Sequence, residues 1–288
     1  MASVLITGGC GFLGAALAAR ARAAGHSVTS ADVLEGADRP LDASDTGAVA
    51  ALVAELRPAA IVHLAAGLTD AGERDPVATT RLNALGTAAI FAAAEAARTE
   101  RVIYATSISA VGPTRGPVGD DTRLDPGNVY GATKAFCEHL ARAMSARPDA
   151  PCYLGLRFGY VYGPGRVRGW RDVQMIVERV RAGERHLVYP DYPDPLDWTW
   201  IDDAAEVLLC ALERPLPRNA VANVVGDKRH VRDAIAHLQS RFPDLTVEPI
   251  ATRTPPAAWS LVNDSLQGLL GYVPTTTLEQ GIDRMLAA

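Results

Sequence analysis

The sequence predicts an α/β protein in which a doubly wound parallel sheet is joined to a smaller C-terminal α/β lobe. In the first half of the chain, short apolar runs alternate with alanine-rich stretches of helical periodicity, the pattern of βαβ units with helices on both faces of a sheet. The first apolar run passes directly into a glycine-rich turn and then into a helix. After about residue 163 loops rich in proline and glycine separate shorter elements, which indicates a second structural unit.

The strands of the sheet are predicted where short apolar runs are bounded by glycine, proline or charged residues. These runs are residues 4–6, 26–31, 60–64, 101–105 and 152–158, and the helices between them are residues 13–24, 46–56, 76–97 and 130–146. Each helix runs back to the end of the sheet at which the next parallel strand begins, and the crossover is expected to be right-handed.

The second half is predicted to contain fewer and shorter elements. A helix at 171–182 lies between two loops, and a strand at 198–201 and a helix at 202–212 follow. We therefore expect residues 1–162 to form the larger domain, with 196–226 returning to it. Residues 163–288 are expected to form the smaller lobe, with a cleft between the two.

Composition argues against several classes of protein. The chain is 48% hydrophobic and 21% charged, as in an ordinary globular protein. Its apolar runs are too short to span a bilayer and its start has no basic signal segment, so we expect no membrane partner and a cytoplasmic location. The net charge of −5 gives no basic surface for nucleic acid. The four cysteines are Cys10, Cys137, Cys152 and Cys210. Their spacing is typical neither of a disulfide framework nor of zinc ligands, so no metal site is expected.

Segment 7–14, TGGCGFLG, links the first strand to the first helix. Glycines here allow a tight turn, close approach of the backbone to a pyrophosphate, and close packing of helix on strand. The helix N-terminus adds unpaired N–H groups and a partial positive charge. Glycines often only make turns, but a strand before and a helix after are the context of a dinucleotide-binding Rossmann fold. Residues 1–162 are therefore predicted to be the dinucleotide-binding domain.

Asp32 follows the second strand, where a carboxylate can accept hydrogen bonds from both ribose hydroxyls of the adenosine. The same carboxylate would repel a 2′-phosphate, and neither Val33 nor Leu34 supplies a cation, so NAD is predicted rather than NADP. The alternative is that Asp32 only caps a loop. Asp42, after the presumed third strand, is predicted to lie beside the adenine.

Tyr130 and Lys134 are four residues apart near the start of a predicted helix, so their side chains share one face. A tyrosine is ordinarily a very weak acid, and an ammonium beside it favours the ionised form. Such a pair can exchange a proton with an alcohol, as acid–base catalysis at a carbinol requires. Ser107 follows the strand 101–105, at the edge where ligands bind in open α/β sheets, and can hydrogen-bond the reacting oxygen.

The alternative for Tyr130 and Lys134 is an ordinary surface pair. Lys134 is, however, one of only two lysines among 28 lysine and arginine residues, the other being Lys228. An arginine would not give the same compact point charge, which favours a specific role for this lysine.

These residues resemble the extended short-chain dehydrogenase/reductase family, the NAD-dependent epimerase/dehydratase group, and the similarity covers nearly the whole chain. Segment 7–14 resembles the TGxxGFxG fingerprint, 63–66 the HLAA strand end, 83–87 the NxxGT helix, and 130–134 the YxxxK pair. Ser107 occupies the place of the catalytic Ser/Thr. Later landmarks of the family are similar to residues 162–165, 198–203, 223–226 and 270–274.

The resemblance implies a set of site residues. The catalytic residues would be Ser107, Tyr130 and Lys134. The cofactor would be bound by Gly8, Gly11, Phe12, Leu13, Gly14, Asp32, Asp42, Ala43, Leu64, Ala65, Ala66, Asn83, Thr106, Tyr130, Lys134 and Phe158. The substrate would be contacted by Ser107, Ile108, Ser109, Tyr130, Tyr160, Arg166 and Trp198.

Three departures from the family pattern bear on the reaction. Sugar-nucleotide dehydratases carry an Asp-Glu pair where this chain has Ile108 and Ser109, and neither can protonate a leaving hydroxyl as a carboxylic acid can. Tyr160 stands where many nucleotide-sugar epimerases have an Asn that contacts the diphosphate, and Leu196 stands in place of an Arg. Dehydration is thus disfavoured. A smaller substrate stays open, although Arg166 and Arg168 can still meet an anion.

The leading hypothesis is an NAD-dependent epimerase-type oxidoreductase that acts at a secondary carbinol of a sugar or nucleotide sugar. The alternative is net dehydrogenation or reduction of a small sugar, sugar acid or other polar carbonyl compound. A third, ranked below both, is a non-catalytic dinucleotide-sensing protein. The resemblance also implies a homodimer formed by the helices around 83–97 and 130–146.

Overall fold

The computed structural model describes residues 1–113, 116–252, 260–263 and 265–288. Within these residues one parallel sheet has the strand order β11-β7-β5-β4-β1-β2-β3. Its strands are β1 (Ser3–Thr7), β2 (Ser27–Asp32), β3 (Arg39–Pro40), β4 (Ala60–His63), β5 (Arg101–Ser107), β7 (Cys152–Phe158) and β11 (Asn219–Val224). The order reverses between β1 and β4, and in such sheets ligands bind beyond the strand ends at this reversal. The predicted Rossmann-type sheet is confirmed.

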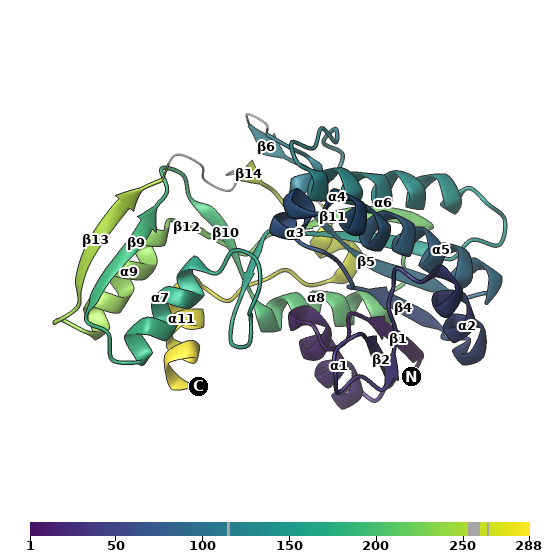
Figure 1. Ribbon diagram of the computed structural model, residues 1–288, viewed down its shortest axis with the longest axis horizontal. Helices are drawn as coiled ribbons and strands as arrows, with labels where there is room; N and C mark the ends of the chain where they lie inside the picture. The colour runs from purple at the N-terminus through teal and green to yellow at the C-terminus, as the bar shows by residue number, and fades with distance from the viewer. Residues whose placement is uncertain (114–115, 253–259, 264) are drawn as a thin grey trace.

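Helices cover both faces of this sheet (Figure 1). Leu5 packs with one set of helices, whereas its neighbours Val4 and Ile6 pack with the other. This alternation explains why the strands are apolar throughout, since neither face is left to solvent. The first set is α2 (Thr46–Leu56), α5 (Gly86–Ala96) and α6 (Val129–Ser145), and the second is α1 (Phe12–Ala23) and α8 (Ile201–Glu213).

The smaller lobe lies beside the carboxyl ends of the strands (left in Figure 1). Its core is aromatic, with Tyr160 and Tyr162 packed against Trp198. Its strands are β8 (Tyr160–Tyr162), β9 (His186–Asp191), β10 (Leu196–Trp200), β12 (Asp227–Arg229) and β13 (Thr246–Ala251), and its helices are α7 (Asp172–Arg181), α9 (Val231–Arg241) and α11 (Leu278–Ala287). The smaller C-terminal α/β lobe expected from the sequence is therefore present.

Short elements complete the chain. They are α3 (Thr69–Arg74), α4 (Pro76–Thr80), a π-helical turn at Arg81–Leu85, a 3₁₀ turn at Ile108–Ala110, β6 (Pro117–Val118), β14 (Ser260–Leu261) and α10 (Leu266–Leu270). Among the helices of the described ranges, none is both long enough and apolar enough to cross a bilayer.

The helix predicted as continuous over 76–97 is broken, and this expectation is corrected. The π turn separates α4 from α5 and directs Asn83, only 1% exposed, into the protein interior. The Thr87 hydroxyl donates to the Asn83 carbonyl at 2.5 Å, within this distorted stretch. Hydrophobic periodicity does not register a single wide turn, which is why the sequence showed one helix.

Candidate active site

The glycine-rich turn after β1 has room for hydrogen atoms only. Gly8 has φ of 69°, and a Cβ there would lie 2.6 Å from the Ala65 backbone nitrogen. A Cβ on Gly14 would lie 2.1 Å from the Gly8 carbonyl oxygen. Gly11 is the N-cap of α1 and makes no side-chain hydrogen bond to the first turn of the helix. It therefore leaves the N–H groups of Phe12 and Leu13 without a side-chain acceptor from the cap. This turn fits the pyrophosphate of a dinucleotide.

Asp32, the last residue of β2, is fixed beside the glycine turn. Its Oδ2 accepts a hydrogen bond from the Cys10 N–H at 3.0 Å, and its Oδ1 accepts from the Leu34 N–H at 3.1 Å. Val33 and Leu34 are exposed next to it and bring no charge. The carboxylate thus lies beside the place expected for the adenosine ribose of NAD. A 2′-phosphate on that ribose would meet no cation from Val33 or Leu34.

The remaining cofactor positions follow β3 and β4. Asp42 is exposed and its Oδ1 accepts from the Ser44 N–H at 2.8 Å, while Ala43 is buried. Leu64 donates its N–H to the Thr7 carbonyl at 3.0 Å, which keeps the segment Leu64–Ala66 against the glycine turn.

Asn83 braces the segment after β4. Its Oδ1 accepts from the Gly67 N–H at 2.7 Å, and its Nδ2 donates to the Gly67 carbonyl at 2.9 Å and to Thr133 Oγ1 at 3.1 Å. The amide therefore connects the cofactor side of the sheet to α6, and these bonds occupy it on both sides.

Tyr130 and Lys134 lie on one face of α6, with Lys134 Nζ 5.7 Å from the centroid of the Tyr130 ring. Lys134 is 4% exposed and donates from Nζ to the Ala105 carbonyl at 2.8 Å, near the end of β5. The Asn128 side chain caps α6 by accepting from the Gly131 N–H at 2.7 Å. The helix thus starts just before Tyr130. This start places the phenol near the carboxyl end of β5.

The turn after β5 packs against the same end of α6. Ser107 Oγ accepts from the Ser109 N–H at 3.1 Å, which leaves its own hydrogen available for donation. A Cβ on Gly131 would lie 2.2 Å from the Ser109 carbonyl oxygen, so the turn and the helix are in contact. The structure therefore brings together the elements that carry Ser107, Tyr130 and Lys134.

A buried ion pair beneath these residues was not predicted. The Arg157 guanidinium binds Glu138 through Nε at 2.9 Å and Nη2 at 2.7 Å, and the two side chains are 3% and 5% exposed. Thr106, predicted as a cofactor contact, donates its hydroxyl to Glu138 Oε1 at 2.7 Å. A charge within the apolar strand 152–158, and a Glu four residues after Lys134, were the available signals.

His63 forms a second buried link, between the cofactor turn and α5. Nδ1 lies 2.6 Å from Thr7 Oγ1 and Nε2 lies 3.1 Å from Thr87 Oγ1. Burial, aided by the charge of Lys134, lowers the pKa of His63 to about 3. The imidazole is therefore neutral at physiological pH and serves as a hydrogen-bonding spacer.

Three of the predicted substrate contacts are buried. Ile108 and Tyr160 are 4% and 7% exposed. Burial, followed by the charges of Tyr192, Asp197 and Asp172, raises the pKa of Tyr160, so its phenol stays protonated. Trp198 is 2% exposed and donates its indole N–H to the Arg229 carbonyl at 3.0 Å, so that N–H is not free for a substrate.

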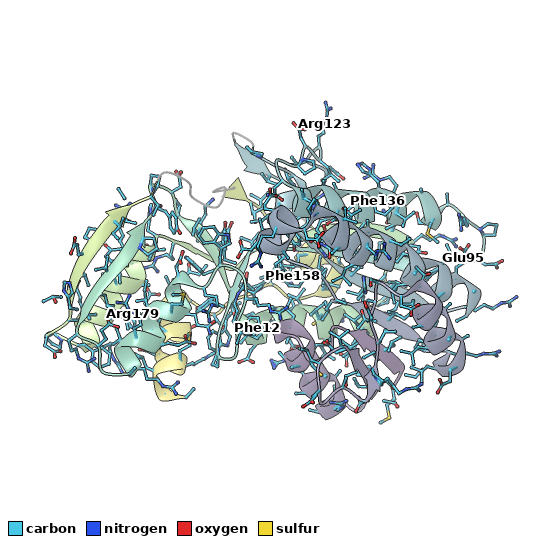
Figure 2. All side chains as sticks on the ribbon, viewed as in Figure 1. Phe12, Glu95, Arg123, Phe136, Phe158 and Arg179 are labelled. Atoms are coloured by element: carbon cyan, nitrogen blue, oxygen red, sulfur yellow. The ribbon has the colours of Figure 1, made fainter. Side chains whose placement is uncertain are left out.

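Arg166 reaches from the smaller lobe to the cofactor turn. Its Cζ lies 5.7 Å from the centroid of the Phe12 ring, the first residue of α1. Phe12 and Phe158, the last residue of β7, lie where the two parts of the molecule meet (Figure 2). The candidate site thus lies at this junction, at the carboxyl ends of the central strands.

Comparison with known proteins assigns the chain to a family. The sequence profile of the NAD-dependent epimerase/dehydratase family matches residues 4–224. UDP-glucose 4-epimerase of Mycolicibacterium smegmatis is 29% identical over 230 residues, which cover 72% of this chain and 72% of that protein. 2-Alkyl-3-oxoalkanoate reductase of Stenotrophomonas maltophilia is 29% identical over 237 residues, which cover 76% of this chain and 68% of that protein.

A solved structure of MoeE5 in complex with UDP-glucuronic acid and NAD is similar along the whole chain. Its TM-score is 0.87 at 25% identity, and the match covers 99% of this chain and 98% of that chain. The profile match, the NAD-bound neighbour and the geometry of the glycine turn agree on the cofactor. The chain therefore belongs to the NAD-dependent epimerase/dehydratase family, among the extended short-chain dehydrogenases/reductases, and is an NAD-dependent enzyme.

Proposed function

We propose that this enzyme epimerises a secondary carbinol of a sugar or nucleotide sugar, with Tyr130 as its acid/base. The observation that carries the proposal is the pairing of Tyr130 with the buried Lys134 on one face of α6, 5.7 Å from ring centroid to Nζ. Both side chains lie beside the turn that holds Ser107, at the edge of the sheet where the cofactor turn also lies.

Each residue has a defined task in this proposal. Ser107 donates its free hydroxyl hydrogen to the substrate oxygen and so orients the carbinol. The Tyr130 phenolate accepts the hydroxyl proton and later returns it to the same oxygen. Lys134 places a positive charge beside the Tyr130 ring, where it would stabilise negative charge that develops during proton transfer. NAD, which the glycine turn and Asp32 would hold, would supply the hydride acceptor and donor that oxidation and re-reduction of the carbinol carbon require.

A second candidate is net oxidation or reduction of a small sugar, sugar acid or other polar carbonyl compound. It is favoured by the similarity to a protein named 2-alkyl-3-oxoalkanoate reductase. It is also favoured by Leu196, which is 2% exposed and offers no charge where many nucleotide-sugar epimerases have an arginine. The same three catalytic residues would serve both reactions.

We expect Tyr130→Phe to lower kcat by about 10²–10⁴-fold, because the substitution removes the group that transfers the proton. Turnover should be measured on a panel of nucleotide sugars, free sugars and sugar acids, with far-UV circular dichroism as the folding control. Undiminished turnover by the variant would contradict the proposed role. Absorbance of NADH separates the two candidates: product without net NADH indicates an epimerase, and stoichiometric NADH or its consumption indicates a dehydrogenase or reductase.

We further propose a homodimer formed through α5 and α6, as the family resemblance implies. The support is apolar exposure along this side of the molecule: Leu85 is 49% exposed and Phe136 is 43% exposed. Phe136 projects from α6 in Figure 2. A cytoplasmic location also stays a prediction.

A further inference from the structure

The loop at 163–171, which follows β8, carries arginines without a carboxylate partner. Arg166, Arg168 and Arg171 form no ion pair with any residue in the described part of the chain, whereas arginines elsewhere in the fold, such as Arg157 and Arg179, pair with glutamates. Of the three, Arg166 is partly buried and lies over the Phe12 ring of the cofactor turn.

The hydrogen bonds of Arg166 go to uncharged acceptors. Nη1 donates to the Val161 carbonyl, and Nε donates to the Arg168 carbonyl at 3.1 Å. The Cζ atom of the guanidinium lies over the Phe12 ring. These contacts fix the side chain in place but do not neutralise it, and an unpaired charge withdrawn from water is costly.

Two further observations concern the surroundings of Arg166. Burial lowers its pKa to about 10, and the charge of Tyr130 opposes this shift more than any other group does. A Cβ on Gly169 would lie 2.9 Å from Arg166 Nη2 and 3.3 Å from Leu68 Cδ1, so the loop, the guanidinium and the residue before α3 are in contact. Arg166 therefore connects the smaller lobe to the cofactor turn and lies beside the start of α3, whose Gly72 packs against Tyr130.

We propose that Arg166 binds an oxyanion of a ligand at the junction of the two lobes, and that this oxyanion is a carboxylate of the substrate close to the reacting carbinol. A planar guanidinium pairs with a carboxylate or a phosphate through two parallel hydrogen bonds, and both ligands of this enzyme could carry such a group. The substrate is favoured because Arg166 lies beside the start of α3, the helix whose Gly72 packs against Tyr130. The N–H groups at the start of α1, by contrast, are placed for the cofactor pyrophosphate. The inference rests on the proposed function, since it locates the carboxylate beside the carbinol that Tyr130 serves.

The test is calorimetric binding to the NAD-loaded enzyme, with probes that differ only in the carboxylate: UDP-glucuronic acid against UDP-glucose, and D-glucuronate against D-glucose. In at least one pair, the affinity of the wild type for the acid should be at least about 10-fold higher than its affinity for the neutral counterpart. Arg166→Gln should abolish that preference. Arg123→Gln, a change at an exposed arginine that projects away from the molecule in Figure 2, should retain it.

A wild type that binds neither acid better than its neutral counterpart would overturn the proposal. So would an Arg166→Gln variant whose affinities for NAD and for the acid fall by the same factor, because the oxyanion would then belong to the cofactor. Failure of the proposed function gives a different result. Turnover that survives Tyr130→Phe removes the acid/base role, yet leaves the binding preference and its dependence on Arg166 intact.

Discussion

At the scale of single residues, Asp32 both holds the turn after β2 and faces the expected place of the adenosine ribose. Asp32→Ala removes the carboxylate that would accept from two ribose hydroxyls. We expect it to weaken NAD binding by about 10- to 100-fold, as for the loss of hydrogen bonds to a charged group. NADP should be affected less, because the 2′-phosphate is no longer repelled.

Fluorescence titration of both dinucleotides measures this change, with the ratio of the two dissociation constants as an internal control for damage to the turn. An equal loss of NAD and NADP affinity would mean that Asp32 does not select between them.

Asp197 in β10 is a buried carboxyl that titrates near neutrality. It is 3% exposed, and its Oδ1 has no hydrogen-bond partner in the described part of the chain. Burial raises its pKa from 3.8 to about 7, although the charge of Lys228 opposes the shift. The folded protein therefore holds a proton between about pH 4 and pH 7 that the unfolded chain releases, so the stability from this group is lost as the pH rises.

Asp197→Asn should remove this pH dependence, because the amide is neutral at every pH. Relative to wild type, the variant should gain free energy of unfolding between pH 4 and pH 8, by up to roughly 4 kcal/mol. Urea unfolding across this range measures the gain, with the exposed Asp194→Asn as the matched control. Parallel profiles for wild type and Asp197→Asn would show that the carboxyl is ionised throughout.

At the scale of elements, the pair Glu138–Arg157 joins α6 to β7 and supports Thr106 at the end of β5. Glu138→Gln leaves a buried guanidinium without its counter-charge, which costs about 3–5 kcal/mol. The exposed pair Glu95–Arg147, at the far end of the same side of the sheet, should be worth less than about 1 kcal/mol.

Chemical denaturation of Glu138→Gln and Glu95→Gln tests this contrast between a buried and an exposed pair. The double variant Glu138→Gln with Arg157→Met should recover part of the loss, because no charge is then left unpaired. Equal destabilisation by the two single variants would contradict the account.

Elements were predictable where local signals were sufficient. The helix predicted at 46–56 coincides with α2, which begins after Asp45, a cap whose side chain accepts from the Gly47 and Ala48 N–H groups. The break at Arg81–Leu85 was missed because it depends on distant partners: Asn83 is held by Gly67 and Thr133. A window of sequence contains neither partner, so only an isolated helix could be inferred from it.

At the scale of the whole molecule, the proposed dimer makes a prediction about mass in solution. Phe136→Glu places a charge in the proposed interface, where it would be buried without a partner, and should convert the dimer to monomer. Met175→Glu on α7 is a matched control, since Met175 and Phe136 are both 43% exposed. Size-exclusion chromatography with light scattering measures the mass. A monomeric wild type, or a Phe136→Glu variant that stays dimeric, would contradict the proposed interface.

The sequence by itself determined the sheet, the cofactor and the residue types at the site. Those features depend on short-range signals: a glycine turn between a strand and a helix, a carboxylate at a strand end, and a tyrosine and lysine one helical turn apart. Only the tertiary structure decided which polar groups are occupied and which are left unpaired. Asn83, Thr106 and Trp198 are engaged by residues far away in the chain. Among the described residues, the guanidinium of Arg166 meets only carbonyl oxygens and a ring. The reason is physical: hydrogen bonds and desolvation depend on distances in space, which the order of residues along the chain does not specify.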